Sequence, residues 1–330
     1  MPGAHRLLGA VAAAMLAAIS GARAEEIAVA NYGSSVSGMP WVVALEKGFF
    51  KEAGAPITGI RGSTGGSTEI RAMIAGELAY ADTGLAAVIS AVRSGADIKI
   101  VNENTSTTAQ FVWIAMPDTP IKALQDLKGK KITFTTPLST SQALDFMLVA
   151  KAGLAKNDVT LISTGPYGAA LTALQNKGVD IALVAEPVYT LNKDRFKPVF
   201  WSRELFPAIN NTVGITSPKV AKERPEVLRG IIAAHRKAVA FMASNRPEAA
   251  AMIAKVYKME PAVAEAVLAQ LMDAKSTDGV SFYSAGDLNA KDLDAQVDGL
   301  RLIGALQGNA QWRDLVDQSF LPDDLKRKLD

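Results

Sequence analysis

The chain has 330 residues, 49% of them hydrophobic, with 35 basic side chains, 33 acidic side chains and no cysteine. A nearly neutral chain without a long Lys/Arg run lacks the electrostatic footprint of a nucleic-acid-binding protein. The absence of cysteine excludes thiol nucleophiles, disulfides and Cys-zinc sites. His5 and His235 are the only histidines, so Ser-His-Asp catalysis and histidine-rich metal sites also lack their parts. Composition therefore favours a binding protein, not an enzyme, and one that needs no cofactor.

Residues 1–24 are predicted to be a signal peptide. Arg6 supplies a charged start, residues 7–19 are apolar, and residues 22–24 (ARA) have the small-x-small pattern of a cleavage site. The apolar stretch is too short to span a bilayer, which needs roughly 20 residues. Cleavage removes 24 of the 330 residues, including two basic and no acidic ones, so the mature chain has no net charge. We expect an exported, periplasmic protein long enough for about two domains.

The first part of the mature chain alternates short apolar strands with helices. Pro40 is typical of the first position of a helix, and Gly48 is typical of the end of that helix. The expected strands cover residues 27–32, 56–61, 78–82, 98–102 and 111–116, and the expected helices cover residues 40–48, 68–75 and 83–95. This alternation predicts βαβ units and parallel sheets.

The middle of the chain repeats this alternation, and the end does not. The expected strands here cover residues 127–136, 158–163, 179–185, 198–201 and 211–216, with helices over residues 139–153 and 165–178. After residue 216 the pattern is nearly pure helix through residue 330, interrupted by prolines. No low-complexity linker separates the two halves, so we expect two lobes joined by crossing strands.

Loops rich in Gly, Ser and Thr follow the predicted strands. Ligands of open parallel sheets bind beyond the carboxyl ends of the strands, where these loops lie. Each loop leads into a helix whose first N–H groups are unpaired and whose dipole end is positive, which suits a small organic anion. The loop candidates are Ser34, Ser35, Ser63, Gly66, Thr83, Thr136, Ser139 and Thr140. The alternative is that these residues only cap helices, and Ser139 with Gln142 has capping-box spacing.

Four larger side chains stand near the same strand ends. Trp41 begins the first helix and either packs in the core or contacts the ligand; Tyr167 follows a Gly-Pro turn and is the stronger aromatic candidate. Arg61 ends the second strand and is placed to hold an anion bidentately, unless it lies over the sheet edge. Glu186 precedes Pro187, so it either caps the next helix or faces the crevice, where it would favour an amine.

Four sequence blocks resemble the nitrate/sulfonate/taurine-type substrate-binding proteins of ABC importers. The blocks are LEKGFFKEAG, GGSTEIRAMIAGELAYADTG, LKGKKITF and LTALQNKGVDIALVAEPVYT, and the resemblance spans residues 27–217. It implies a type II periplasmic-binding-protein fold: α/β, with two lobes, each a central sheet flanked by helices, joined by a two-strand hinge. It also implies ligand contacts at the eight loop candidates named above and at Glu186.

The resemblance further implies a role and a set of partners. We expect lobe I to comprise residues 25–107 and 213–330, and lobe II residues 108–212. The expected protein is a monomer that closes on a sulfonate, taurine-like or carboxylate anion and delivers it to a membrane permease with a cytoplasmic ATPase. One alternative is a pyrimidine-precursor binding protein, or an enzyme on the same fold, although the related enzymes use Cys and His residues that this chain lacks. Another is a sensory role, in which the closed lobes dock to a receptor.

Overall fold

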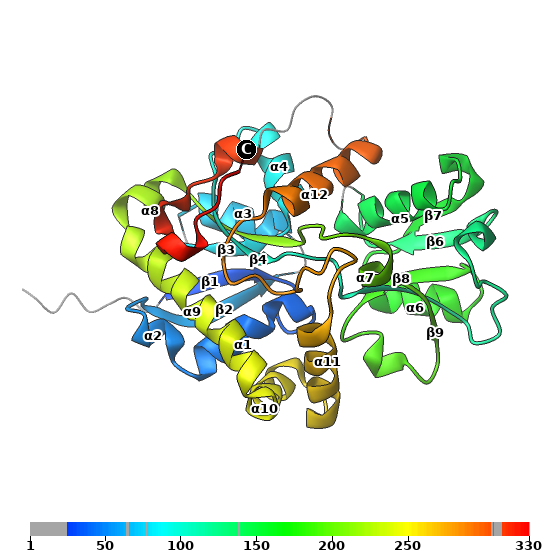
Figure 1. Ribbon diagram of the computed structural model, residues 1–330, viewed down its shortest axis with the longest axis horizontal. Coiled ribbons are helices and arrows are strands. Elements are labelled where there is room, and N and C mark those ends of the chain that lie inside the picture. The colour runs from blue at the N-terminus through cyan, green and yellow to red at the C-terminus, as the bar shows by residue number, and fades with distance from the viewer. Residues whose placement is uncertain are drawn as a thin grey trace, which may run out of the picture.

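A computed structural model describes residues 25–63, 66–76, 78–137, 139–304, 306 and 312–329. The predicted signal peptide, residues 1–24, lies outside the described residues. Two five-stranded sheets, each flanked by helices, lie side by side along the long axis of the molecule (Figure 1). This arrangement confirms the predicted mixed α/β fold with one sheet in each half.

The first sheet has the strand order β2-β1-β3-β10-β4. Its strands are β1 (Glu25–Ala30), β2 (Ile57–Ser63), β3 (Ala81–Thr83), β4 (Lys99–Thr105) and β10 (Thr212–Thr216). Strand β1 is parallel to both of its neighbours, β2 and β3, whereas β10 is antiparallel to both β3 and β4. The strand predicted over residues 78–82 is therefore shifted, because pairing begins only at Ala81.

The second sheet has the order β7-β6-β8-β5-β9. Its strands are β5 (Phe111–Ala115), β6 (Lys131–Phe134), β7 (Thr160–Ser163), β8 (Ile181–Ala185) and β9 (Lys197–Trp201). Here β5 is antiparallel to both β8 and β9. The predicted parallel pairing therefore holds for β1 with β2 and β3 and for β6 with β7 and β8, but not for β5 and β10. Both β5 and β10 arrive from the other sheet and enter at the carboxyl edge of their neighbours, so each must run in the opposite direction.

Helices cover both faces of each sheet. The core on one face of the first sheet includes residues of α1 (Met39–Glu46), α2 (Phe49–Glu52), α9 (Pro225–Ser244), α10 (Arg246–Tyr257) and α11 (Pro261–Asp273). The other face packs against α3 (Gly66–Ile74), α4 (Leu85–Arg93) and α12 (Ala290–Leu302). The second sheet has α5 (Thr140–Lys151) on one face and α6 (Tyr167–Gln175) on the other. The short α7 (Ser202–Leu205) and α8 (Pro218–Glu223) flank β10 in the chain.

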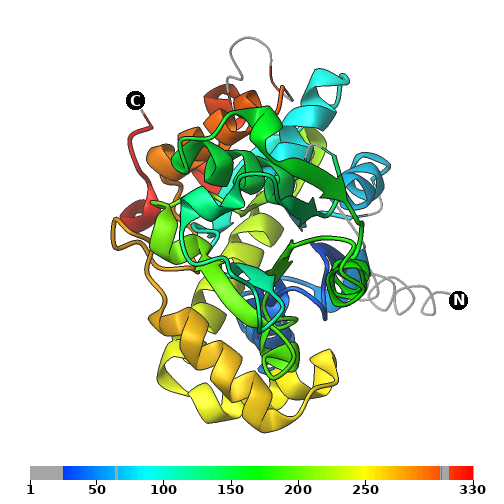
Figure 2. The ribbon, with the colours of Figure 1, turned by 90° about the vertical axis from the view of Figure 1, so that its right-hand side faces the viewer.

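The C-terminal third is less helical than the sequence predicts. Between α11 and α12 the chain is irregular and bonds to the backbone near the end of β4: Ser106 N–H donates to Phe282 O at 2.9 Å, and Ser284 N–H donates to Asn104 O at 3.0 Å. Beyond α12, the described residues form short 3-10 turns at Trp312–Leu315, Gln318–Phe320 and Asp323–Leu325. In the segment between α11 and α12, hydrogen bonds to β4 and to the connection that follows β4 take the place of the predicted helix. Figure 2 shows this part of the chain from the end of the molecule.

His235, on α9, is a packing residue. Its side chain is fully buried, its ring centroid lies 4.6 Å from that of Trp41, and neither ring nitrogen has a hydrogen-bond partner within the described residues. Burial lowers the pKa of His235 to about 3, so the ring is neutral in the fold. An unfolded histidine takes up a proton below about pH 6.5, so this group costs stability progressively as the pH falls from about 6.5 toward 3.

We therefore expect the imidazole signal of His235 to keep the chemical shift of the neutral ring between pH 8 and pH 5. The measurement is proton NMR on residues 25–330, which contain no second histidine. The urea stability of the protein should also fall with acid more steeply than that of His235→Gln, by about 1.4 kcal/mol per pH unit at most. A titration midpoint near pH 6.5 would mean that the ring is solvated and would contradict the buried placement.

Candidate functional site

The carboxyl ends of strands from both sheets meet at the two connections that cross between them. The first connection, between β4 and β5, contains Gln110, which is 3% exposed. Gln110 Oε1 accepts from Ser35 Oγ at 3.4 Å, and its backbone oxygen accepts from Glu186 N–H at 2.9 Å. Ser35 follows β1 and Glu186 follows β8, so one residue of the connection links the loops of both sheets. Sequence reasoning missed Gln110, because nothing in the strand pattern marks it.

The loop after β1 presents buried hydroxyls and is held by two tyrosines from the C-terminal third. Ser35 Oγ lies 2.9 Å from Ser37 Oγ. Tyr257 OH donates to Ser35 O at 2.6 Å, and Tyr283 OH donates to Val36 O at 2.7 Å. The predicted Ser34 instead is exposed, and among the described residues its hydroxyl bonds only to Asn31 O of its own turn. The structure therefore brings Ser35, but not Ser34, to the junction.

A second group of hydroxyls lies where β6 leads into α5. Ser139 caps α5 by accepting from Gln142 N–H at 3.2 Å, as its spacing predicts. Ser139 Oγ and Thr135 Oγ1 each lie 2.8 Å from Ser141 Oγ. Thr140 Oγ1 accepts from Gln296 Nε2 of α12 at 3.2 Å, which joins the second sheet's helix to the C-terminal third. Thr136 is exposed beside this group.

Glu186 stands in a charged cluster made by both halves of the molecule. Its side chain is fully buried, and it accepts from Thr190 N–H at 3.1 Å and Thr190 Oγ1 at 3.0 Å. Burial raises the pKa of Glu186, and the two hydrogen bonds from Thr190 and the positive charge of Arg203 oppose that rise. The Arg203 guanidinium lies over the Trp201 ring at 3.8 Å. Glu186 thus caps the following turn, which was one of the two predicted outcomes.

Two hydrogen-bond donors in this cluster have no acceptor. Arg203 Nη1 and Gln270 Nε2 are buried and unpartnered within the described residues. Arg203 follows β9 of the second sheet. Gln270 is on α11, whose apolar residues pack in the core of the first sheet. Buried donors without acceptors are rare in folded proteins and call for an explanation. Sequence reasoning missed both residues, because only the fold brings them around Glu186.

Two acceptor groups at the other sheet also lack partners. Both oxygens of Glu69, on α3, and the hydroxyl of Thr83, at the end of β3, are buried and unpartnered within the described residues. Thr83 was predicted from its position, whereas Glu69 was not. Of the remaining candidates on this edge, Ser63 ends β2 and Gly66 begins α3. Their side-chain surroundings lie outside what the structure describes.

Two predicted ligand residues lie elsewhere, and a third is only partly accessible. Trp41 is fully buried, stacks with Phe50 and donates from Nε1 to Asp82 at 2.6 Å, so its ring belongs to the core. Arg61 lies on the exposed outer strand β2 and pairs with Glu26 at 3.1 Å. For both, the packing of the first sheet decides where the side chain lies. Tyr167, at the start of α6, is half-buried between two cores.

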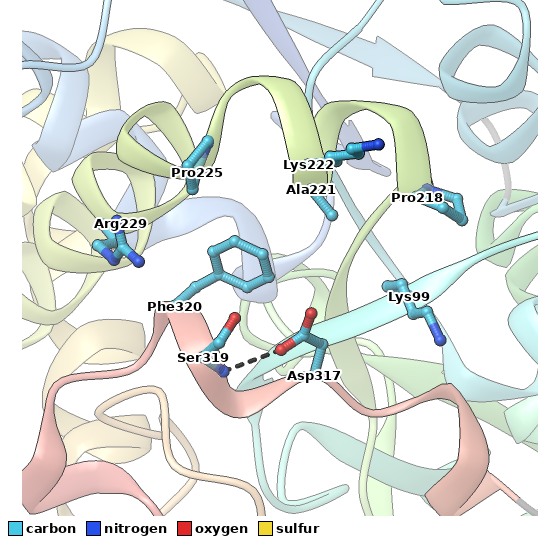
Figure 3. A pocket seen from close by; sticks show the side chains of 9 residues that line it. All are labelled: Lys99, Pro218, Ala221, Lys222, Pro225, Arg229, Asp317, Ser319 and Phe320. Carbon is cyan, nitrogen blue, oxygen red and sulfur yellow. Dashed lines mark hydrogen bonds between the residues drawn. The ribbon is translucent and has the colours of Figure 1, made fainter.

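A pocket of about 270 Å³ lies at the opposite edge of the first sheet (Figure 3). Lys99, which begins β4, and Pro218, which begins α8, line it together with residues of α9 and of the turn at Phe320. The hydrogen bond from Ser319 N–H to Asp317 Oδ1, 3.0 Å long, shapes that turn. Since β4 ends at the junction and starts at this pocket, the pocket is remote from the predicted crevice.

Metal-binding clusters and membrane-spanning helices are both absent from the described residues. They contain no group of three or more His, Cys, Asp or Glu side chains placed to hold a metal ion. Among the same residues, every helix is too short or too polar to cross a membrane.

The chain is similar to known binding proteins in sequence and in fold. A family model described as NMT1/THI5 like matches residues 36–250. A binding protein of Brucella abortus (strain 2308) is 26% identical over 71% of this chain and 71% of its own length. A Bacillus subtilis (strain 168) protein named for binding aliphatic sulfonates is 24% identical, over 86% of this chain and 83% of its own.

A solved structure of a binding protein is similar to this chain in fold. The alkanesulfonate-binding protein SsuA of Xanthomonas axonopodis pv. citri, solved with bound MOPS, has a TM-score of 0.71 at 19% identity and covers 88% of this chain and 97% of its own. Such a likeness at low identity shows the fold, which is that of periplasmic binding proteins. It confirms the fold that the four sequence blocks predicted. The family model covers more than half of the residues, and the chain therefore belongs to the NMT1/THI5-like family.

Proposed function

We propose that this protein is the periplasmic substrate-binding component of an ABC importer and that it captures a small organic anion between its two sheets. The observation that carries the proposal is the junction itself. Loops from the carboxyl ends of both sheets meet there around Gln110, and two buried donors, Arg203 Nη1 and Gln270 Nε2, lack acceptors within the described residues. The relatives named for sulfonate binding support the same class of ligand.

Two lobes follow from the course of the chain. Lobe I comprises residues 25–107 and 213–330, lobe II comprises residues 108–212, and the connections β4–β5 and β9–β10 form the hinge. Residues 1–24 act as the export signal and are removed. The helix α12 contacts both α4 and α5, so it lies across the lobe boundary. The partners in this proposal are a membrane permease and a cytoplasmic ATPase, and the protein works as a monomer.

The anion is held by donors from both lobes. Arg203 and Gln270 provide side-chain donors, and the start of α5, with Ser139 and Thr140, adds hydroxyls and a positive dipole end. A hydrogen bond to a charged group contributes about 1.5–3 kcal/mol net, so three or four such bonds together approach the roughly 8 kcal/mol of a micromolar complex, before association entropy is subtracted. Ser35, Ser63, Gly66, Thr136 and Tyr167 remain as further contacts on the crevice loops.

Closure follows from where these donors come from. Arg203 belongs to lobe II and Gln270 to lobe I, so an anion bound by both contacts them together only when the lobes are closed. The ligand then stabilises the closed state by its differential affinity for that state. The closed form is the one that the permease recognises.

We expect Arg203→Gln to weaken binding of the sulfonates or carboxylates that stabilise the wild type by about 10- to 100-fold, which corresponds to the loss of one charged hydrogen bond. A thermal-shift screen of sulfonates, carboxylates, nitrate and pyrimidines finds the ligand, and calorimetry measures the affinity. Arg229→Gln, on the outer surface of α9, is the matched control and should bind normally.

Small-angle scattering tests the closure directly, because the radius of gyration should decrease when ligand saturates the protein. Unchanged dimensions at saturation would contradict hinge closure. Unaltered affinity of Arg203→Gln would place the anion site elsewhere, and stabilisation by pyrimidines alone would favour the alternative ligand class.

A further inference from the structure

The pocket at the outer edge of the first sheet is lined by more positive than negative side chains (Figure 3). Lys99, Lys222 and Arg229 line it, and Asp317 is the acidic residue among the described residues that do. Three basic side chains against one acidic side chain give this lining a formal charge of +2, which equals that of the whole chain of 330 residues. Such a local excess of one sign attracts ligands of the opposite sign.

Two of these cations are available to a ligand. The ammonium groups of Lys99 and Lys222 make no hydrogen bond or ion pair within the described residues. The other charged groups are engaged: Arg229 pairs with Glu226 at 2.5 Å, and Asp317 accepts from a backbone N–H of its own turn at 3.0 Å. An ammonium group has three donors and no acceptor, so each of the two lysines can donate to anionic oxygens.

The rest of the pocket wall is mostly apolar. The Phe320 ring lines the pocket together with Ala221 of α8 and the prolines that begin α8 and α9. Figure 3 shows this ring with Arg229 on one side and with Lys99 and Lys222 on the other. Small-molecule sites combine such an apolar lining with a few polar groups that fix the orientation of the ligand. The wall therefore suits a molecule whose apolar body packs on Phe320 and whose anionic end reaches the lysines.

Backbone hydrogen bonds hold the segments of this pocket together. Lys99 lies opposite Thr216 where β4 pairs with β10, and α8 begins two residues later with Ser217 as its cap. The C-terminal turn is fixed to the same strand, because Asp317 N–H donates to Ile100 O at 2.9 Å. The pocket walls are therefore in place before a ligand arrives, and a preformed site spends less free energy on ordering.

We propose that this pocket is a second binding site, separate from the crevice, for a small organic dianion: a body of about one ring that carries a phosphate ester or two carboxylates. Its volume of about 270 Å³ is near the lower end of small-molecule sites, which span about 300–1,000 Å³. The ammonium groups of Lys99 and Lys222 match two negative charges with charge-assisted hydrogen bonds. The family model ends at residue 250, so the turn that carries Phe320 lies outside the matched region.

The test compares molecules that have both the ring and the charges with molecules that have only one of them. Isothermal calorimetry at pH 8 is run with phenyl phosphate and phthalate, which are dianions at that pH, beside inorganic phosphate and benzyl alcohol. At least one of the two aromatic dianions should bind about tenfold or more tightly than inorganic phosphate and than benzyl alcohol. Added salt should weaken this binding, because it screens exposed charges.

Variants of the pocket show where the dianion binds. The double variant Lys99→Gln with Lys222→Gln changes side chains outside the core and should weaken binding about tenfold. Ala221→Leu keeps every charge and fills part of the pocket, so it should also weaken binding. Lys51→Gln with Lys255→Gln removes the same charge from exposed positions of α2 and α10, and this matched control should bind like the wild type.

Each outcome supports or overturns the proposal. Binding of phenyl phosphate alone would identify a phosphate ester, and binding of phthalate alone would identify a dicarboxylate; both would support the site. Benzyl alcohol or inorganic phosphate binding as tightly as the aromatic dianions would contradict it, as would binding of no dianion. Unchanged affinity in both the double lysine variant and Ala221→Leu would place the bound molecule elsewhere. The crevice proposed above is unaffected by any of these results, because it is tested by other variants.

Discussion

Gly214→Ala is expected to lower the free energy of unfolding by about 3–5 kcal/mol, the combined effect of overpacking and of broken buried hydrogen bonds. A Cβ at Gly214 would lie 2.0 Å from Asn102 Oδ1 and 2.1 Å from the Tyr80 hydroxyl. These two groups bond to each other at 2.9 Å, and Asn102 Nδ2 donates to Asn104 Oδ1 at 2.6 Å, so the network fills the space beside the glycine. Urea unfolding followed by circular dichroism measures the loss.

A matched glycine shows whether the effect is specific to the position. Gly168 lies in α6, and a Cβ added there would have nothing within 4 Å among the described residues, so Gly168→Ala should be neutral or stabilise by up to about 1 kcal/mol through helix propensity. Adding Tyr80→Phe to Gly214→Ala removes one of the two clashing oxygens and should recover part of the loss. Equal stability of Gly214→Ala and the wild type would show that the network is not packed against β10.

Asp292→Asn is expected to stabilise the protein at pH 8 by about 1–3 kcal/mol, although it replaces a buried carboxyl group. Asp292, in the first turn of α12, and Glu103, near the end of β4, are both fully buried, and neither oxygen of Asp292 has a hydrogen-bond partner among the described residues. Burial raises the pKa of both carboxyls, and their mutual repulsion raises that of Asp292 further. Asp292 therefore keeps its proton in the fold, and an amide can donate to Glu103 without this cost.

The sign of the pH dependence follows from proton binding. The unfolded chain releases the Asp292 proton above about pH 4, while the folded protein retains it, so the fold binds more protons and loses stability as the pH rises. The gain from Asp292→Asn should therefore be largest at pH 8 and vanish near pH 4. Urea midpoints across that range measure it. Asp298→Asn, at an exposed position of the same helix that pairs with Arg301, is the matched acid-to-amide control, and a destabilised Asp292→Asn at pH 8 would contradict a protonated Asp292 in the fold.

The strand and helix pattern of the first 216 residues was predictable, because each element buries a stripe or face of apolar side chains with its own period. Even there, β3 begins later than the apolar run, and the direction of β5 and β10 was missed. Local pattern carries no information about which edge of a sheet a strand enters. The segment between α11 and α12 was missed for a related reason: its structure comes from backbone bonds to the end of β4, not from its own side chains.

The residues of the candidate site also divide into those that were predictable from the sequence and those that were not. Ser139 as a helix cap and Thr83 at a strand end were predictable, because both depend on a few neighbouring residues. Glu69, Gln110, Arg203 and Gln270 have no local motif, and they come to the edge of the crevice only because strands from two sheets end there. Trp41 and Arg61 stand at the right places along the chain, but the packing of the first sheet turns one into the core and the other to the outer edge.

By itself, the sequence determined which classes of protein are excluded by composition, the sheet-and-helix architecture and the family. These properties depend on residue types and on their spacing along the chain. Only the tertiary structure decided which polar groups are buried without partners. That property depends on the distances between residues far apart in the sequence, such as Arg203 and Gln270 around Glu186, and no periodicity encodes those distances.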